Sequence, residues 1–564
     1  MEQTKSMKMD IPRKIMTQCA LITLFAFSDC AYAETSAQTD GSGTISFHGN
    51  QTAELFSKEL DESLKGVIEN SVVASDASPF PKGFVRSSLP GHWWDDTSWT
   101  RDAGGILREL ALWGRLEQGV LVAEFLRTHV GHNPEGYHTF PVYFRPGAQA
   151  PGSDWGTEMD GTSAIVIGMV RLWQRLPAGH EMKGKLRRFL TGADSPIAYV
   201  VKKAGEHPLI AGSGEFGGGW GVDGEWYNIV TNNLVRQALL ACAEVEEECG
   251  HPDKARVLHD TAARLRDNIQ KQLVDPKNGS WIWCISPQTM TVDEAVVNHP
   301  QVKGTASING ASSCYADAEG LEPVAAGWPG AAPAQVTLDN IYNRYVVRKE
   351  QFEKYGMCTF VDYNERQPIP SYASWLSYCD CFAAQTMLLL DKTEALDKIL
   401  TWIAATTYME GSPTADFIRD LAQGKADVDP GERGRSRYWF TERNFSPDFT
   451  GARDIGCGKL NIVNVAEPMK LARLMLGIDD RYADTVRIIP RLPASWTSVE
   501  CRNWPVKIKD GVVNLNLRFE KKPAGRFALR LEVEGGKSIP RLAVRLPDGT
   551  RKEYGPVAGT LEIK

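Results

Sequence analysis

Residues 103–130 decide the fold class of this chain, and they read AGGILRELALWGRLEQGVLVAEFLRTHV. Apolar residues recur every three or four positions on both sides of Gly114, which is the spacing of one helix face. The stretch therefore predicts two amphipathic helices joined near Gly114. Similar apolar periodicity returns at 162–176, 229–248, 253–273, 338–349, 374–390, 394–408 and 463–476.

Loops rich in Gly, Pro and Trp connect these helical stretches. No internal repeat of solenoid length is found along the chain, which favours a closed ring of helices over an open array. The sequence therefore predicts a mainly α protein, a helical toroid whose inner face forms a cleft at one end.

The pattern changes near Asp484. Apolar and polar residues alternate at 512–519, 527–533 and 542–546, and Pro-Asp-Gly follows the last of these stretches as a turn signal. These features predict a small antiparallel β-domain over 484–564. The helical domain then covers 86–483, and 34–85 is expected to be an N-terminal leader or linker.

The N-terminal 33 residues have the features of a secretory signal peptide. Basic residues precede a short apolar run at 19–27, and Ala31-Tyr32-Ala33 follows as a cleavage site. We expect cleavage after Ala33 and export to the periplasm or the exterior. A lipoprotein anchored through Cys30 is the less favoured alternative, because Asp29 precedes the cysteine.

The composition excludes several partner classes. The chain has 564 residues, with 63 Lys and Arg against 70 Asp and Glu, and no basic block stands out. Nucleic acid and anionic membranes are therefore not expected as partners, and no later apolar run is long enough to span a bilayer. No phosphate-binding loop and no C-x-x-C pair occur, so no cofactor and no metal site are predicted. The oligomeric state stays open.

Two clusters in the first third combine Trp with charged residues. The first contains Trp94, Trp99, Arg101 and Asp102, where aromatic faces could stack on a sugar ring and charged groups could hold its hydroxyls. The alternative is an ordinary helix start capped by Asp102 and paired to Arg101. The second cluster contains Trp155 and Asp160, again just before a helix.

Two later clusters offer carboxylates among aromatic residues. Trp220, Asp223 and Glu225 lie in a Gly-rich stretch, where an apolar surround would keep Glu225 protonated as a general acid, with Asp223 as its rival. Trp439 precedes Glu442, the best candidate for a general base. Glu467, inside the following helix, is the second candidate for the base.

Two carboxylates in an aromatic cleft are the minimum equipment for glycoside hydrolysis. One protonates the leaving oxygen, and the other activates water or attacks the sugar. The two stereochemical outcomes, inversion and retention, stay open because they depend on the separation of the carboxylates.

The ordered clusters resemble those of the glucoamylase family, glycoside hydrolase family 15, and of the wider six-hairpin glycosidases with an (α/α)6 barrel. Trp99-Thr100-Arg101-Asp102 resembles the segment that holds the sugar in the −1 subsite, and Trp155-Gly156 with Asp160-Gly161 resembles a subsite segment with one residue fewer. Arg366 resembles a substrate-contacting arginine of that barrel.

The resemblance extends to the carboxylates. The stretch around Glu225 is similar to the general-acid segment, although Asp-Gly-Glu-Trp replaces its usual Trp-Glu-Glu context. Thr441-Glu442 resembles the general-base segment. The C-terminal part, together with 439–443, is similar to α-L-rhamnosidases of family 78.

The resemblance implies an exported, exo-acting and inverting α-glucosidase of glucoamylase type that acts on oligo- or polysaccharide. Glu225 would be the acid and Glu442 the base, and the substrate would be held by Trp94, Trp99, Arg101, Asp102, Trp155, Asp160, Trp220, Arg366 and Trp439. An α-L-rhamnosidase-like glycosidase is the second interpretation. A polysaccharide lyase and a non-catalytic glycan-binding protein are two further alternatives.

Overall fold

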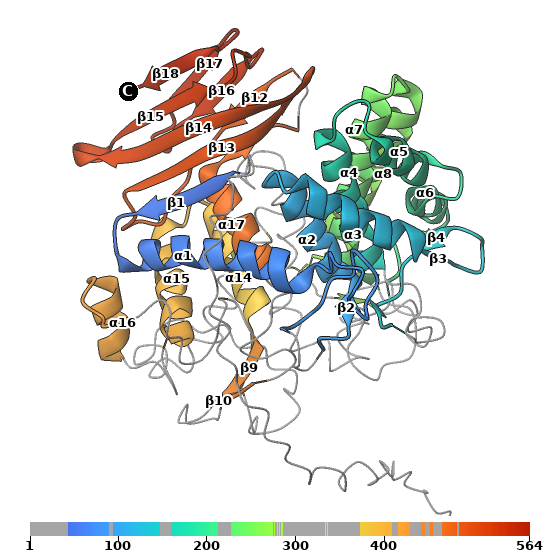
Figure 1. Ribbon diagram of the computed structural model, residues 1–564, viewed down its shortest axis with the longest axis horizontal. Coiled ribbons are helices and arrows are strands. Elements are labelled where there is room, and N and C mark those ends of the chain that lie inside the picture. Colours follow the sequence, from blue (N-terminus) through green and yellow to red (C-terminus); the bar gives the residue numbers. More distant parts are fainter. Residues whose placement is uncertain are drawn as a thin grey trace, which may run out of the picture. The chain divides into compact units, whose positions relative to one another are not determined.

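The computed structural model describes residues 43–89, 94–146, 159–212, 227–274, 373–408, 415–428, 465–481 and 484–564, with short pieces within 276–285, 333–336 and 439–454. Figure 1 shows helices and β-sheets in this part of the chain. The helices are α1 (Gln51–Gly66), α2 (Thr100–Leu112), α3 (Leu116–Thr128), α4 (Met159–Arg175), α5 (Glu181–Thr191), α6 (Pro196–Glu206), α7 (Ile229–Glu248), α8 (Pro252–Gln272), α14 (Ser377–Leu389), α15 (Thr393–Tyr408), α16 (Ala415–Ala422) and α17 (Ala466–Leu476).

The helical stretches expected from the sequence are confirmed wherever the structure describes them. The opening stretch forms α2 and α3, and Gly114 between them has φ +80°, a conformation that glycine adopts without steric cost. The stretch 374–390 differs at its start, because Ala373–Leu376 form strand β8 before α14 begins. The expected helix at 338–349 lies outside the described residues.

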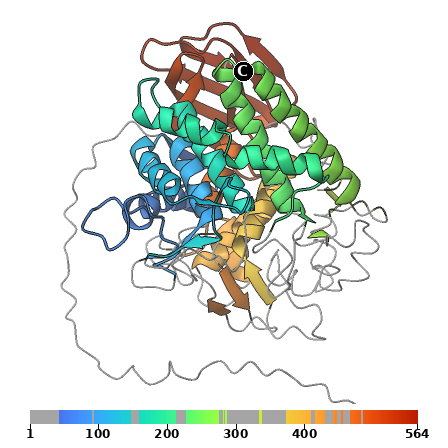
Figure 2. The ribbon, with the colours of Figure 1, turned by 90° about the vertical axis from the view of Figure 1, so that its right-hand side faces the viewer.

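Helices that follow one another pack as hairpins: α2 with α3, α4 with α5, α7 with α8, and α14 with α15. The first helices of these pairs form, together with α17, a continuous row in the order α14, α17, α2, α4 and α7. The neighbours α2, α4 and α7 are visible in Figures 1 and 2. The described part of the chain follows the row only from α14 to α7, so the closed toroid stays a prediction.

Four helices of this row run parallel. Gly104 of α2 lies against Ala164 of α4, and Leu107 lies against Gly168, so the two helices advance together. The same holds for α2 and α17. Gly105 faces Ala466 near the start of both helices, and Glu109 bonds Arg473 further along both. On α4 and α7, Arg171 and Gln174 bond Glu244 and Glu248 in the same order. The N-termini of α2, α4, α7 and α17 therefore lie at one end of the row.

The close approach of α2 and α4 depends on glycine. A Cβ atom on Gly104 would lie 2.5 Å from two backbone atoms of α4, in Ala164 and Ile165. Gly104→Ala is therefore expected to lower the free energy of unfolding by about 1–3 kcal/mol, because the helices must separate. Urea denaturation measures the loss.

The matched control is Gly184→Ala on the exposed face of α5, where the nearest atom to a new Cβ is 3.8 Å away. This variant should gain about 0.5–1 kcal/mol, since alanine restricts the unfolded chain more than glycine does. Equal stability of Gly104→Ala and the wild type would contradict the packing argument.

Two sheets dominate the C-terminal part. One has the strand order β1-β13-β14-β15-β18 and the other has the order β11-β12-β16-β17. The strands of the first are β1 (Thr44–His48), β13 (Ser498–Ile508), β14 (Gly511–Lys522), β15 (Arg526–Val533) and β18 (Gly559–Ile563); those of the second are β11 (Ile478–Asp479), β12 (Val486–Ile488), β16 (Leu542–Arg545) and β17 (Arg551–Tyr554).

These sheets differ from the expected β-domain in two respects. Strand β1 comes from the segment expected to be a leader or linker, and it pairs with β13 because its alternate residues Ile45 and Phe47 are buried. Strands β12 and β16 pair in parallel, so the second sheet is not wholly antiparallel. The folded body therefore begins well before residue 86.

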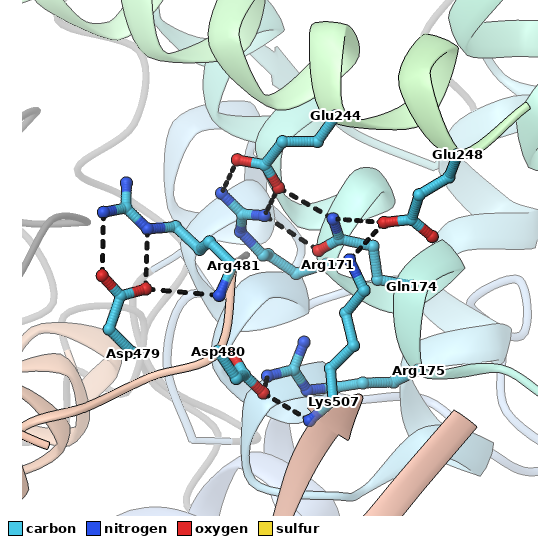
Figure 3. Close-up of polar contacts among 9 residues, drawn as sticks. All are labelled: Arg171, Gln174, Arg175, Glu244, Glu248, Asp479, Asp480, Arg481 and Lys507. Atoms are coloured by element: carbon cyan, nitrogen blue, oxygen red, sulfur yellow. Dashed lines mark hydrogen bonds and ion pairs between the residues drawn. The ribbon is translucent and has the colours of Figure 1, made fainter. Parts of the chain in front are cut away.

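A polar network joins the helices to the sheets (Figure 3). Asp480, beside β11, accepts hydrogen bonds from Arg175 of α4 at 2.7 Å and from the backbone N–H of Lys507 at 2.6 Å. The Lys507 ammonium, in β13, bonds Glu248 of α7. Next to this network, the ring of Trp113 lies 5.2 Å from that of Trp504, so apolar packing continues from α2 into the sheet.

Candidate active site

The shared end of the parallel helices brings together several residues singled out in the sequence. Arg101 and Asp102 lie in the first turn of α2, Asp160 in the first turn of α4, and Glu467 in the first turn of α17. Helix N-termini carry partial positive charge, which stabilises carboxylates placed beside them. This end of the row is the candidate active site.

An aromatic corner, formed by Trp94, Trp99 and Tyr143, adjoins this end. Strand β2 (Ser98–Trp99) pairs with β5 (Tyr143–Phe144), so the Trp99 and Tyr143 rings lie 5.1 Å apart, and the Trp94 ring lies 5.7 Å from Trp99. All three side chains are partly exposed. They offer ring faces of the kind on which sugars stack.

Arg145 extends the aromatic corner. Its guanidinium lies 5.1 Å from the Trp94 ring centre and 5.3 Å from that of Tyr143, and its Nε donates to Thr97 at 2.9 Å. Trp94 itself has φ +68°, a strained conformation for a bulky residue, and such strain tends to concentrate at functional sites. Tyr143 and Arg145 do not stand out in the sequence, because only the β2–β5 pairing brings them to Trp99.

Arg101, Asp102 and Asp160, the charged residues beside the aromatic corner, differ in exposure. Arg101 and Asp102 are each 16% exposed at the side chain and lie 4.0 Å apart, whereas Asp160 is 2% exposed and lies 3.5 Å from the Arg101 guanidinium. Asp102 does not cap α2, because the N-cap residue is Trp99. The burial of Asp160 favours a role in holding Arg101 over the direct substrate contact that we expected.

Glu467 lies where α17, α14 and α2 meet. Its carboxylate accepts from Gln385 at 2.9 Å and lies 3.7 Å from the Arg108 guanidinium. Further along α2, the buried carboxylate of Glu109 accepts hydrogen bonds from Arg108, Trp113 and Arg473. Glu109 and Arg108 were not predicted as site residues, although a charged pair inside the apolar stretch 103–130 is a signal of a buried polar contact.

The strand pairing brings the backbone of Glu442 to the residue that precedes α14. Glu442 begins β9 (Glu442–Phe445), where it pairs with Leu376, the residue directly before α14. Strand β9 lies between β8 and β10 (Ala452–Asp454). Outside the described residues lie Trp155, Trp220, Asp223, Glu225 and Arg366.

Trp439 differs from the expectation that it would contact substrate. Its side chain is fully buried, its ring lies 5.1 Å from that of Phe56, and its backbone N–H donates to Glu59 at 3.1 Å. These contacts favour a packing role against α1.

Comparisons with known proteins bear on the fold. No protein-family model matches the sequence, and neither does the sequence of any curated protein. Among solved structures, the α-L-rhamnosidase from Aspergillus terreus aligns with a TM-score of 0.53 and 11% identity, over 93% of this chain and 50% of the rhamnosidase. The α-L-rhamnosidase from Dictyoglumus thermophilum aligns with a TM-score of 0.51 and 10% identity, over 92% and 50%.

A glucoamylase from Saccharomycopsis fibuligera also aligns, with 14% identity and a TM-score of 0.45, over 76% of this chain and 96% of the glucoamylase.

Among the described helices, none is both long enough and apolar enough to cross a membrane. The chain spans about half the length of the rhamnosidases that it matches. The fold is therefore similar to that of the two α-L-rhamnosidases, as the resemblance in sequence led us to expect.

Proposed function

We propose that this chain is an exported glycoside hydrolase that releases the terminal sugar of an oligo- or polysaccharide. The observation that carries the proposal is the position of Arg101 and Asp102 beside the aromatic corner, at the end where four parallel helices begin. Ring faces bind the apolar side of a sugar, and charged groups take its hydroxyls through charge-assisted hydrogen bonds.

The two catalytic carboxylates are assigned from the sequence. Glu225 precedes β6 (Tyr227–Asn228) and the start of α7 by a few residues, and Glu442 pairs with the residue that precedes α14. Both helices belong to the row that carries Arg101. We assign Glu225 as general acid and Glu442 as general base, with inversion of the anomer, and keep Asp223 and Glu467 as their rivals.

Two substrate classes follow from different observations. The ordered motifs favour α-glucosides, as in the glucoamylase family. The similarity in fold to two α-L-rhamnosidases favours α-L-rhamnosides as the second class. One fold can serve many substrate specificities, so hydrolysis of both kinds of glycoside must be measured to distinguish the two classes.

The test is hydrolysis of a panel of oligosaccharides and aryl glycosides by the mature chain, with NMR detection of the fresh anomer. We expect release of one terminal sugar with inverted configuration from one of the two classes. An unsaturated product from uronate polymers, or tight glycan binding without release, would overturn the proposal.

Glu225→Gln is expected to spare substrates whose leaving group is already acidic, such as aryl or fluoride glycosides, and to impair natural glycosides by about 10²–10⁴-fold. The reason is that only a poor leaving group needs a proton in the transition state. Steady-state rates on both substrate types measure the difference. Equal loss on both would move the acid role to Asp223.

A further inference from the structure

A hairpin between α3 and α4 brings two histidines together, next to an aspartate that lies between α5 and α6. His132 in β3 (Gly131–His132) pairs directly with His138 in β4 (His138–Thr139), and their ring centres lie 4.8 Å apart. Asp194, between α5 and α6, adds a carboxylate. One potential ligand atom from each of the three residues lies within 4.8 Å of those of the other two.

We propose that His132, His138 and Asp194 form a zinc-binding site. Two imidazoles and one carboxylate are donors that Zn²⁺ accepts, whereas Ca²⁺ and Mg²⁺ prefer oxygen ligands alone. Zinc bonds of about 2.0–2.1 Å in a tetrahedron place ligand atoms roughly 3.4 Å apart. His138 Nε2 and Asp194 Oδ2 already lie 3.6 Å apart, and the exposed His132 ring can turn toward them. Water would complete the coordination.

The backbone holds the three ligands in place before any ion binds. The His138 N–H donates to the carbonyl oxygen of Asp194 at 2.8 Å, which aligns the hairpin with the turn before α6. Glu135, at the hairpin tip, bonds Lys202 at 2.6 Å and Lys203 at 2.8 Å, both on α6. Two attachments thus join the segments that supply the ligands. Binding an ion would therefore cost little conformational entropy for ordering these segments.

The environment of His138 suits a metal ligand. Its ring stacks on Phe189 of α5 at 5.1 Å and 12°, which limits its rotation. At 3.6 Å, the His138–Asp194 contact is too long for a hydrogen bond that would compete with an ion.

The experiment is isothermal titration of ZnCl2 into the untagged mature protein after treatment with chelator. We expect about one zinc ion per chain and a melting temperature that rises with zinc and falls back with chelator, since the ion binds only the folded state. His132→Ala, which removes an exposed side chain, and Asp194→Asn should each weaken zinc binding at least about tenfold.

His259→Ala is the matched control. His259 lies 2.9 Å from Glu247, so it forms a histidine–carboxylate pair that is not part of the cluster, and its loss should leave zinc binding unchanged. Zinc binding that is equal in the wild type and His132→Ala, or a wild type that binds no more zinc than magnesium, would overturn the proposal. Glycosidase activity does not enter any of these readouts, so this test is separate from that of the proposed function.

Discussion

Glu442→Gln is expected to lower kcat on a natural glycoside by about 10²–10⁴-fold while leaving substrate binding nearly unchanged. The amide keeps the shape of the carboxylate but cannot take a proton from the attacking water. The position pairs with the residue that precedes α14, one of the helices in the row that carries Arg101 and Asp102. Steady-state kinetics, together with glycan binding by titration calorimetry, separate the two effects.

Glu117→Gln is the control for this prediction. Glu117 is exposed on α3, and the same chemical change there should leave kcat within experimental error. A Glu442→Gln variant that stays within about tenfold of the wild type would contradict the assignment. If Glu467→Gln instead showed the loss, the base role would move to α17.

The second large effect is expected on stability, at Glu109. This carboxylate is 1% exposed and accepts hydrogen bonds from Arg108 at 2.7 Å and from Arg473 at 3.1 Å, whose side chains are 4% and 8% exposed. Glu109→Gln removes the negative charge between two buried guanidinium groups. We expect a loss of about 3–5 kcal/mol in the free energy of unfolding, measured by urea denaturation.

Glu124→Gln is the control for charge removal. Glu124 lies 2.8 Å from Arg127 and 3.3 Å from Lys185, but it is 37% exposed, so water can replace its partners. Its loss should cost less than about 1 kcal/mol. A Glu109 variant as stable as the Glu124 variant would show that the buried charges contribute little beyond their desolvation.

Local sequence was sufficient for most of the helices. The periodicity of 229–248 predicted α7 to the residue, and Gly114 marked the break between α2 and α3, because helix formation and its interruption depend on neighbouring residues. The strands β14, β15 and β16 were predicted from alternation for the same reason. Strand β1 was not, since its partner β13 lies more than 400 residues away in the sequence and pairing depends on tertiary contact.

Part of the candidate site could likewise be predicted from the sequence, and part of it depends on tertiary contacts. The chemical character of the Trp99-Thr100-Arg101-Asp102 cluster is readable from the sequence, because those residues are neighbours in the chain. The sequence did not identify Tyr143 and Arg145 as neighbours of Trp99, nor did it show that Asp160 is buried behind Arg101. Those facts depend on the β2–β5 pairing and on the parallel packing of α2 and α4.

The proposed zinc ligands also meet only through tertiary structure. No metal site was expected, because recognisable ligand motifs keep their residues at short, regular spacings. His132 and His138 meet across a hairpin, and one backbone hydrogen bond brings Asp194 to them. The sequence by itself determined most of the helices, three strands of the C-terminal sheets, and the aromatic and charged character of the first cluster. Tertiary structure decided which distant side chains meet. The physical reason is that periodicity records which face of an element is buried, but not what covers it.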